Sequence, residues 1–102
     1  MLKHATITAY GSIVGTSITG VHQSVLTAAD DLLYLAICNS CDEELEVSLD
    51  GGTTNHFLLG PYQSLSFDAH ANSRRIAKPT IQVRHTGVQP TVGKFTITGI
   101  EA

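Results

Sequence analysis

Charged residues make up only 15% of this chain of 102 residues, and tryptophan is absent. No run of about 20 apolar residues occurs, so we expect no membrane-spanning helix. The low charge and a hydrophobic content of 42% argue against a disordered chain, because disorder requires low hydrophobicity and high net charge. The sequence pI of about 5.9 argues against a nucleic-acid-binding protein, which usually carries a basic stripe and a high pI.

Catalytic and metal-binding motifs are also missing. The sequence contains no G-x-S-x-G, no H-E-x-x-H, no phosphate-binding Gly-Lys-Ser/Thr loop and no EF-hand pattern. Cys38 and Cys41 form a lone C-x-x-C, whereas zinc sites commonly need a second pair of ligands. Structural thiols are the favoured reading, with a disulfide or a metal site as the alternatives. We therefore expect no enzyme and no cofactor.

Alternation of apolar and polar residues is the main structural signal in the chain. It predicts half-buried antiparallel strands over residues 5–10, 44–50, 64–68, 80–84 and 94–98. Residues 32–38 are apolar without a break, which is compatible with a helix but favours a strand buried on both faces. A single helical turn is expected at residues 28–31.

Turn residues separate these strands. Asp50-Gly51-Gly52 precedes the apolar residues 57–59 and predicts a hairpin, because glycine tolerates the positive φ of tight turns. Gly60-Pro61 ends the next strand. Seven or eight short strands with turns between them predict an all-β fold, an antiparallel β-sandwich or jelly roll in a single domain over residues 1–102.

Residues 1–29 are less regular and form a possible N-terminal arm or edge strands. They are rich in Thr, Ser and Ile, are uncharged from residue 5 to residue 29, and contain three glycines that suggest bulges or bends. Open uncharged edges are prone to pair with other chains. This arm is therefore expected either to pair with a neighbouring subunit or to form an ordinary hairpin within the chain.

Charge is divided between the halves of the sequence. Residues 1–51 contain seven acidic residues and one basic residue, a net −6, whereas residues 52–102 carry a net +3. The candidate contact residues are the acidic Asp42, Glu43 and Glu44 and the basic Arg74, Arg75 and Lys78, with the loop 50–55 as a further candidate. They form either solvated loops or complementary surfaces that meet across a subunit contact.

Four segments resemble small structural proteins of tailed-phage particles. They are residues 33–39 (LYLAICN), 44–57 (ELEVSLDGGTTNHF), 60–68 (GPYQSLSFD) and 93–100 (GKFTITGI). In such proteins an apolar strand ends in Asn, a V-S-L-D-G strand follows, and a Gly-x-hydrophobic-Thr-hydrophobic strand closes the domain. The resemblance covers about residues 32–100 and carries no site residue over.

The resemblance implies a non-enzymatic virion protein, first of all a capsid decoration (cement) protein. Its partners would be the major capsid protein or other virion subunits, and it would be a homo-oligomer, trimeric or dimeric. Because residues 1–6 lack a signal-like apolar stretch, we expect it to be made in the host cytoplasm and to reside in the virion. The alternatives are a neck, tail or fibre-base component, or a receptor- or carbohydrate-binding module, which a cluster of Tyr10, Tyr62 and His56 would favour.

Overall fold

The computed structural model describes residues 8–69, 71 and 74–102 and contains eight strands and one 3₁₀ turn. The elements are β1 (Ala9–Val14), η1 (Gly15–Ser17), β2 (Gln23–Thr27), β3 (Leu32–Asn39), β4 (Leu45–Ser48), β5 (Phe57–Leu59), β6 (Ser64–Asp68), β7 (Thr80–His85) and β8 (Lys94–Glu101). The all-β prediction is confirmed. No helix among these residues is long and apolar enough to cross a membrane.

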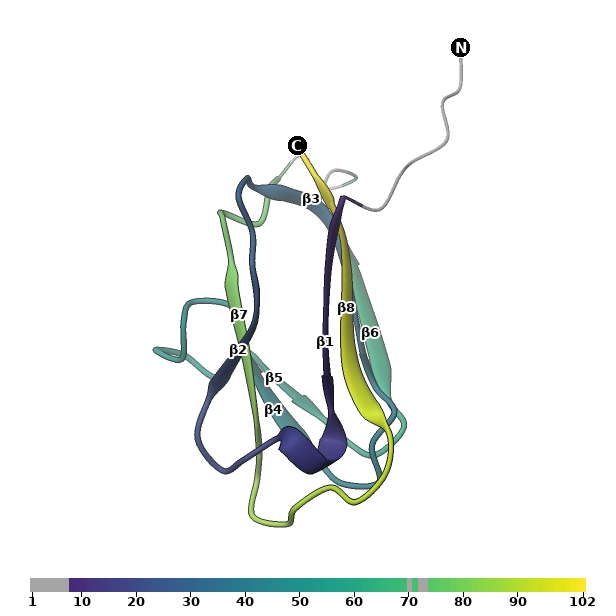
Figure 1. Ribbon diagram of the computed structural model, residues 1–102. Helices are drawn as coiled ribbons and strands as arrows, with labels where there is room; N and C mark the ends of the chain where they lie inside the picture. Colours follow the sequence, from purple (N-terminus) through teal and green to yellow (C-terminus); the bar gives the residue numbers. More distant parts are fainter. Residues whose placement is uncertain (1–7, 70, 72–73) are drawn as a thin grey trace.

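The strands form two four-stranded antiparallel sheets. Sheet I has the order β1-β8-β3-β6 and sheet II the order β2-β7-β4-β5. The two sheets face each other, with β1, β8 and β6 on the right of Figure 1 and β2 and β7 on the left. Because β1 pairs with β8, β2 with β7, β3 with β6 and β4 with β5, the chain is a long hairpin rolled into a sandwich. This is the jelly roll of the sequence prediction.

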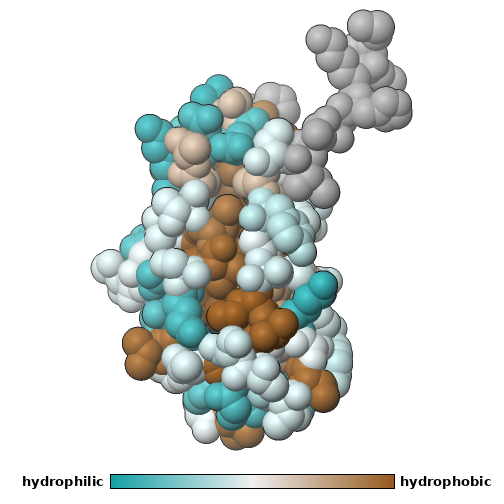
Figure 2. All heavy atoms as spheres, in the orientation of Figure 1, coloured by the Kyte–Doolittle hydropathy of each residue, from teal (hydrophilic) through white to brown (hydrophobic). Residues whose placement is uncertain are grey.

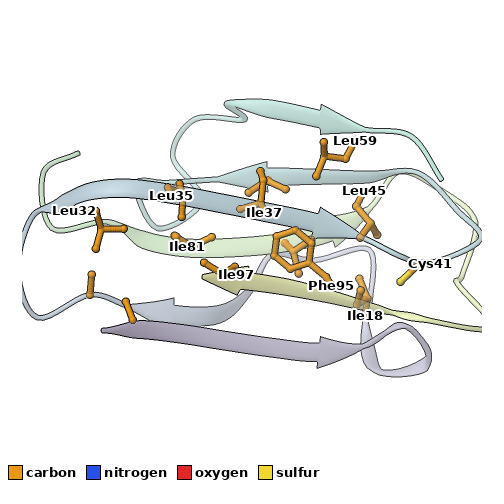
Figure 3. Close-up of a cluster of buried hydrophobic side chains, with 14 residues drawn as sticks. Ile18, Leu32, Leu35, Ile37, Cys41, Leu45, Leu59, Ile81, Phe95 and Ile97 are labelled. Carbon is orange, nitrogen blue, oxygen red and sulfur yellow. The ribbon is translucent and has the colours of Figure 1, made fainter. Parts of the chain in front are cut away.

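The core lies between the sheets and is made by alternate residues of the inner strands. Leu35 and Ile37 of β3 point into the same layer as Ile81 of β7 and Phe95 and Ile97 of β8 (Figure 3). All five are at most 1% exposed. The alternation seen in the sequence therefore marks the inward face of these strands.

Among the described residues, Asn39 and Ser48 are the buried polar ones. Asn39 Nδ2 donates to the carbonyl groups of Glu43 and Gly60, at 2.9 and 3.0 Å, and lies 3.3 Å from that of Leu59. Its Oδ1 accepts from the N–H of Cys41 at 2.9 Å. One side chain thus joins the end of β3 to the β3–β4 and β5–β6 connections.

The two open sides of the sandwich differ. On the β1–β2 side the backbones come close together, since a Cβ on Gly11 would lie 2.6 Å from the carbonyl oxygen of Val25. Hydrophobic atoms fill the opening between these strands (Figure 2), and Ile13, Val25 and Leu26 pack there against the core. The opposite side is formed by β5 and β6.

The structure corrects several local expectations. Residues 28–31 form bends without a helical turn. The strand at 32–38 is confirmed, but only one of its faces is fully buried, and Tyr34, Ala36 and Cys38 on the other face are half-buried. Of the three glycines expected at bulges or bends, Gly15 begins the 3₁₀ turn η1 and Gly20 lies in a bend, whereas Gly11 is in a regular part of β1. The register shift in β2 lies between Ser24 and Leu26.

Pairing of the N-terminal arm with a neighbouring subunit stays a prediction. The hairpin expected within the arm does not form over its described residues, because β1 pairs with β8 and β2 with β7. β1 and β2 are edge strands of sheets I and II. Residues 5–7 of the first expected strand lie outside the described residues.

Candidate functional site

A groove opens on the β5–β6 side of the sandwich, which we call the edge groove. Its volume is about 560 Å³. Its apolar lining residues are Leu49, Phe57, Phe67, Ala69 and Ile76, and its polar ones are Ser66, Asp68, Arg74 and Arg75. Each sheet has an edge strand on this side, β6 in sheet I and β5 in sheet II. The groove is open because no further strand of the described residues covers these two.

Two aromatic rings connect the sheets at the groove. Phe57 comes from β5 and Phe67 from β6, and their ring centroids are 4.8 Å apart with an interplanar angle of 31°. Both side chains are only half-buried. Partly exposed aromatic rings in a concave apolar setting are typical of contact sites, because they offer a large hydrophobic area with few rotatable bonds.

The predicted basic residues divide between the groove and the surface beyond it. Arg74 and Arg75 are exposed and line the groove, and the N–H of Arg74 donates to the carbonyl of Ala69 at 2.9 Å. Lys78 is also exposed but does not line the groove, and its N–H donates to Asp31 Oδ1 at 3.0 Å.

The predicted acidic residues lie at the other end of the sandwich, where Asp42 and Glu44 hold two loops together. Asp42 accepts hydrogen bonds from the N–H and the hydroxyl of Thr91, at 2.9 and 2.6 Å. These hydrogen bonds lower the pKa of the Asp42 carboxyl. Glu44 accepts from the hydroxyl of Thr86 at 2.9 Å. The β3–β4 loop is thereby tied to the β7–β8 loop.

The length of β3 separates the two charged groups. Its first residue, Leu32, forms a bridge with Ile76 near the arginines, and its last residue, Asn39, bonds to the backbone of Glu43. Eight extended residues correspond to about 25 Å. Acidic and basic residues are separated less completely in the fold than in the sequence, because Asp31 lies beside Lys78 and Glu46 forms an ion pair of 2.7 Å with Arg84.

The cysteines do not form a bonded pair. Cys41 is buried and Cys38 half-buried, and both are free thiols. Burial, then the charge of Asp42, raises the pKa of Cys41. Within the described part of the chain no three His, Cys, Asp or Glu side chains are grouped so that they could hold a metal ion.

The aromatic cluster that would favour a carbohydrate or receptor site does not form. Tyr10 is on β1, the edge of sheet I opposite to β6, and His56 directly precedes β5. Tyr62 lies in the β5–β6 loop, where its N–H donates to the carbonyl of Cys41. Tyr10 is thus on the opposite side of the sandwich from the other two rings, and His56 and Tyr62 lie before and after β5.

Sequence reasoning missed the apolar residues of the groove. Leu49, Phe57, Phe67 and Ile76 come from four separate segments, and only the pairing of β5 with β4 and of β6 with β3 brings them together. The exposure of β6, where even the apolar Leu65 is 37% exposed, is visible only in the structure, so no signal in the sequence marked these residues as a groove.

No protein-family model, no curated protein and no solved structure matches this chain.

Proposed function

We propose that this protein is a structural subunit of a tailed-phage particle, first of all a capsid decoration protein, that binds neighbouring subunits through the edge groove. The observation that carries the proposal is the groove itself. It combines half-exposed aromatic rings, an open strand edge and two arginines on one side of a small rigid sandwich. The segments that resemble phage virion proteins supply most of β3, β4, β6 and β8 and the first residue of β5, Phe57, and therefore both aromatic rings of the groove.

A surface of this kind can bind a partner without catalysing a reaction. Apolar area at the centre of a contact provides most of the affinity, and charges at its rim set orientation. The partner would be the major capsid protein or another virion subunit. A neck, tail or fibre-base component is the second assignment, and it would use the same groove against a different subunit.

Co-sedimentation with purified capsids tests the proposal. We expect the wild-type protein to bind capsids and to protect them against heat or chelation. Replacement of Arg74 and Arg75 by Glu should weaken binding by about tenfold or more. The matched control is Lys78→Glu, which changes a neighbouring exposed cation outside the groove and should bind like the wild type.

A second pair of variants tests the apolar part of the groove. Phe57→Ala should weaken capsid binding, whereas Leu58→Ala should not, because Leu58 is 58% exposed on the same strand and does not line the groove. The melting temperature of each variant separates lost binding from lost folding. Absence of wild-type binding to capsids would refute the decoration role, and binding to purified necks or tails would then support the second assignment.

A further inference from the structure

The outer edge of β6 is available for another strand. β6 is the last strand of sheet I, and all its residues except Phe67 are exposed. It contains no proline, lysine or arginine, its one charged residue is Asp68 at its last position, and its pairing with β3 runs without a register shift. Natural proteins usually protect long flat edges with such charges, prolines or bulges, because bare edges attract other strands.

The phase of the hydrogen bonds shows which backbone groups face outward. The N–H of Asn39 donates to the carbonyl of Gln63, and in an antiparallel ladder such bonded pairs recur at every second residue. Leu65 and Phe67, opposite Ile37 and Leu35, therefore direct their backbone groups toward β3. Ser64 and Ser66 direct theirs toward the open edge.

We infer that a second copy of this chain adds its β6 antiparallel to this edge, with Ser66 opposite Ser66 of the second copy on a twofold axis. The two sheets I would then continue as one eight-stranded sheet. This register places outward-directed backbone groups opposite each other, as an antiparallel ladder requires. It also places Leu65 of each copy beside Phe67 of the other on the inward face, where the pair extends the apolar base of both edge grooves.

Charge favours a second copy as the occupant. In an antiparallel pair, the end of β6 at Asp68, where Arg74 and Arg75 also line the groove, lies alongside the start of β6 in the second copy. At that start, Gln63 is bonded to Asn39, and the acidic residues 42–44 follow directly. The twofold axis repeats this juxtaposition of basic and acidic ends on both sides of the contact. Such complementarity sets register and speeds association.

The remaining edges are poorer candidates. β5 has three residues and is followed by Gly60-Pro61, and β2 is interrupted by a register shift. β1 is longer and has no charged residue, but its backbone approaches that of β2 closely at Gly11. β6 thus combines a flat edge, matching side chains and matching charge.

This inference rests on the proposed function only in that the contact between two copies lies at the same groove. Light scattering of the full chain should show a dimer that dissociates on dilution over about 1 mM to 1 µM. Replacement of Ser66 by Pro removes both hydrogen bonds at the twofold axis without removing one to β3, and should raise the dissociation constant about tenfold or more. The matched control is Ser12→Pro, which removes an outward N–H from the opposite edge strand and should leave association unchanged.

A cross-linking experiment gives a positive readout that does not depend on lost stability. Bonded antiparallel pairs have Cα atoms about 5.5 Å apart, which suits a disulfide. With Cys38→Ser in the background, Ser66→Cys should form a covalent dimer on oxidation, and Ser12→Cys should not. The dissociation constant should also rise with salt, since the charged ends are exposed.

Each contrary outcome has a separate meaning. A wild-type protein that stays monomeric to about 1 mM, or a cross-link through Ser12→Cys alone, overturns the β6 contact. A wild-type monomer that binds capsids leaves the proposed function standing, whereas a dimer that binds no virion part refutes the proposed function and leaves the β6 contact standing.

Discussion

Asn39 shows how one buried amide can hold three segments in place. It satisfies the N–H of Cys41 and the carbonyls of Glu43 and Gly60 from a position with no solvent exposure. We predict that Asn39→Ala lowers the free energy of unfolding by about 3 kcal/mol, because it leaves several buried polar groups without partners. Urea denaturation measures the effect.

The control for this prediction is an exposed amide with one contact. Asn55 is in the β4–β5 loop, and its Oδ1 lies 2.8 Å from His22 Nε2. Asn55→Ala should change stability by less than about 1 kcal/mol. Equal losses in the two variants would contradict the role assigned to Asn39.

Asp50 provides a pH-dependent contribution in the same hairpin. The N–H of Thr54 and the hydroxyl of Ser48, each 2.8 Å from Oδ1, lower the pKa of Asp50 to about 2. Because an unfolded Asp titrates near 4, this stabilisation is complete above about pH 4 and is lost as the pH falls through about 2. We predict that Asp50→Asn flattens the fall in unfolding free energy between these pH values.

Urea unfolding at several acidic pH values checks this prediction. Ser48→Ala removes one of the two donors and should give a slope between those of the wild type and Asp50→Asn. An Asp50→Asn protein with the wild-type slope would show that other carboxyl groups determine the acid sensitivity.

Among the elements, the strands with one wet face were predictable. In β7 as far as Val83 and in β8 as far as Gly99, every second residue is buried and the intervening residues are half-buried or exposed, which matches the period of two in the sequence. β2 was not predicted, because an edge strand with a register shift has no fully buried residue and breaks the period. The D-G hairpin was correctly predicted, since Gly51 and Gly52 both adopt positive φ.

The contact between β1 and β2 gives a prediction at this scale. Gly11→Ala would force the two edge strands apart, because its Cβ would lie too close to the Val25 carbonyl oxygen. We expect a loss of about 1–3 kcal/mol in unfolding free energy, the usual cost of overpacking. Ser12→Ala, an exposed neighbour in the same strand, is the control and should be nearly neutral; a similar loss there would implicate strand propensity instead of close approach.

At the scale of the whole molecule, the chain closes on itself, with Ala9 opposite Gly99. The fold class could be predicted from alternation and turns, but the order of the strands could not, because no local signal tells β1 to pair with β8. The edge groove was out of reach for the same reason. Its aromatic rings become neighbours only after both sheets have formed.

The topology also determines the expected folding rate. β8 lies between β1 and β3, so sheet I cannot form until the two ends of the chain have met. Folding dominated by such distant contacts is slow, and we predict refolding in milliseconds to seconds. Stopped-flow fluorescence of the tyrosines after urea dilution measures it. Refolding within microseconds would mean that local hairpins, rather than closure of the roll, limit the rate.

The two thiols finally give the molecule a built-in pair of chemical labels. Cys38 is half-buried on the outer face of β3, opposite Ser64 of β6 in the ladder, whereas Cys41 is fully buried and its pKa is raised by burial. An alkylating reagent should therefore modify Cys38 first and reach Cys41 only when the sandwich opens. The rate of the first reaction would report what covers the β6 side, and the rate of the second would time the opening of the core, both in the unaltered protein.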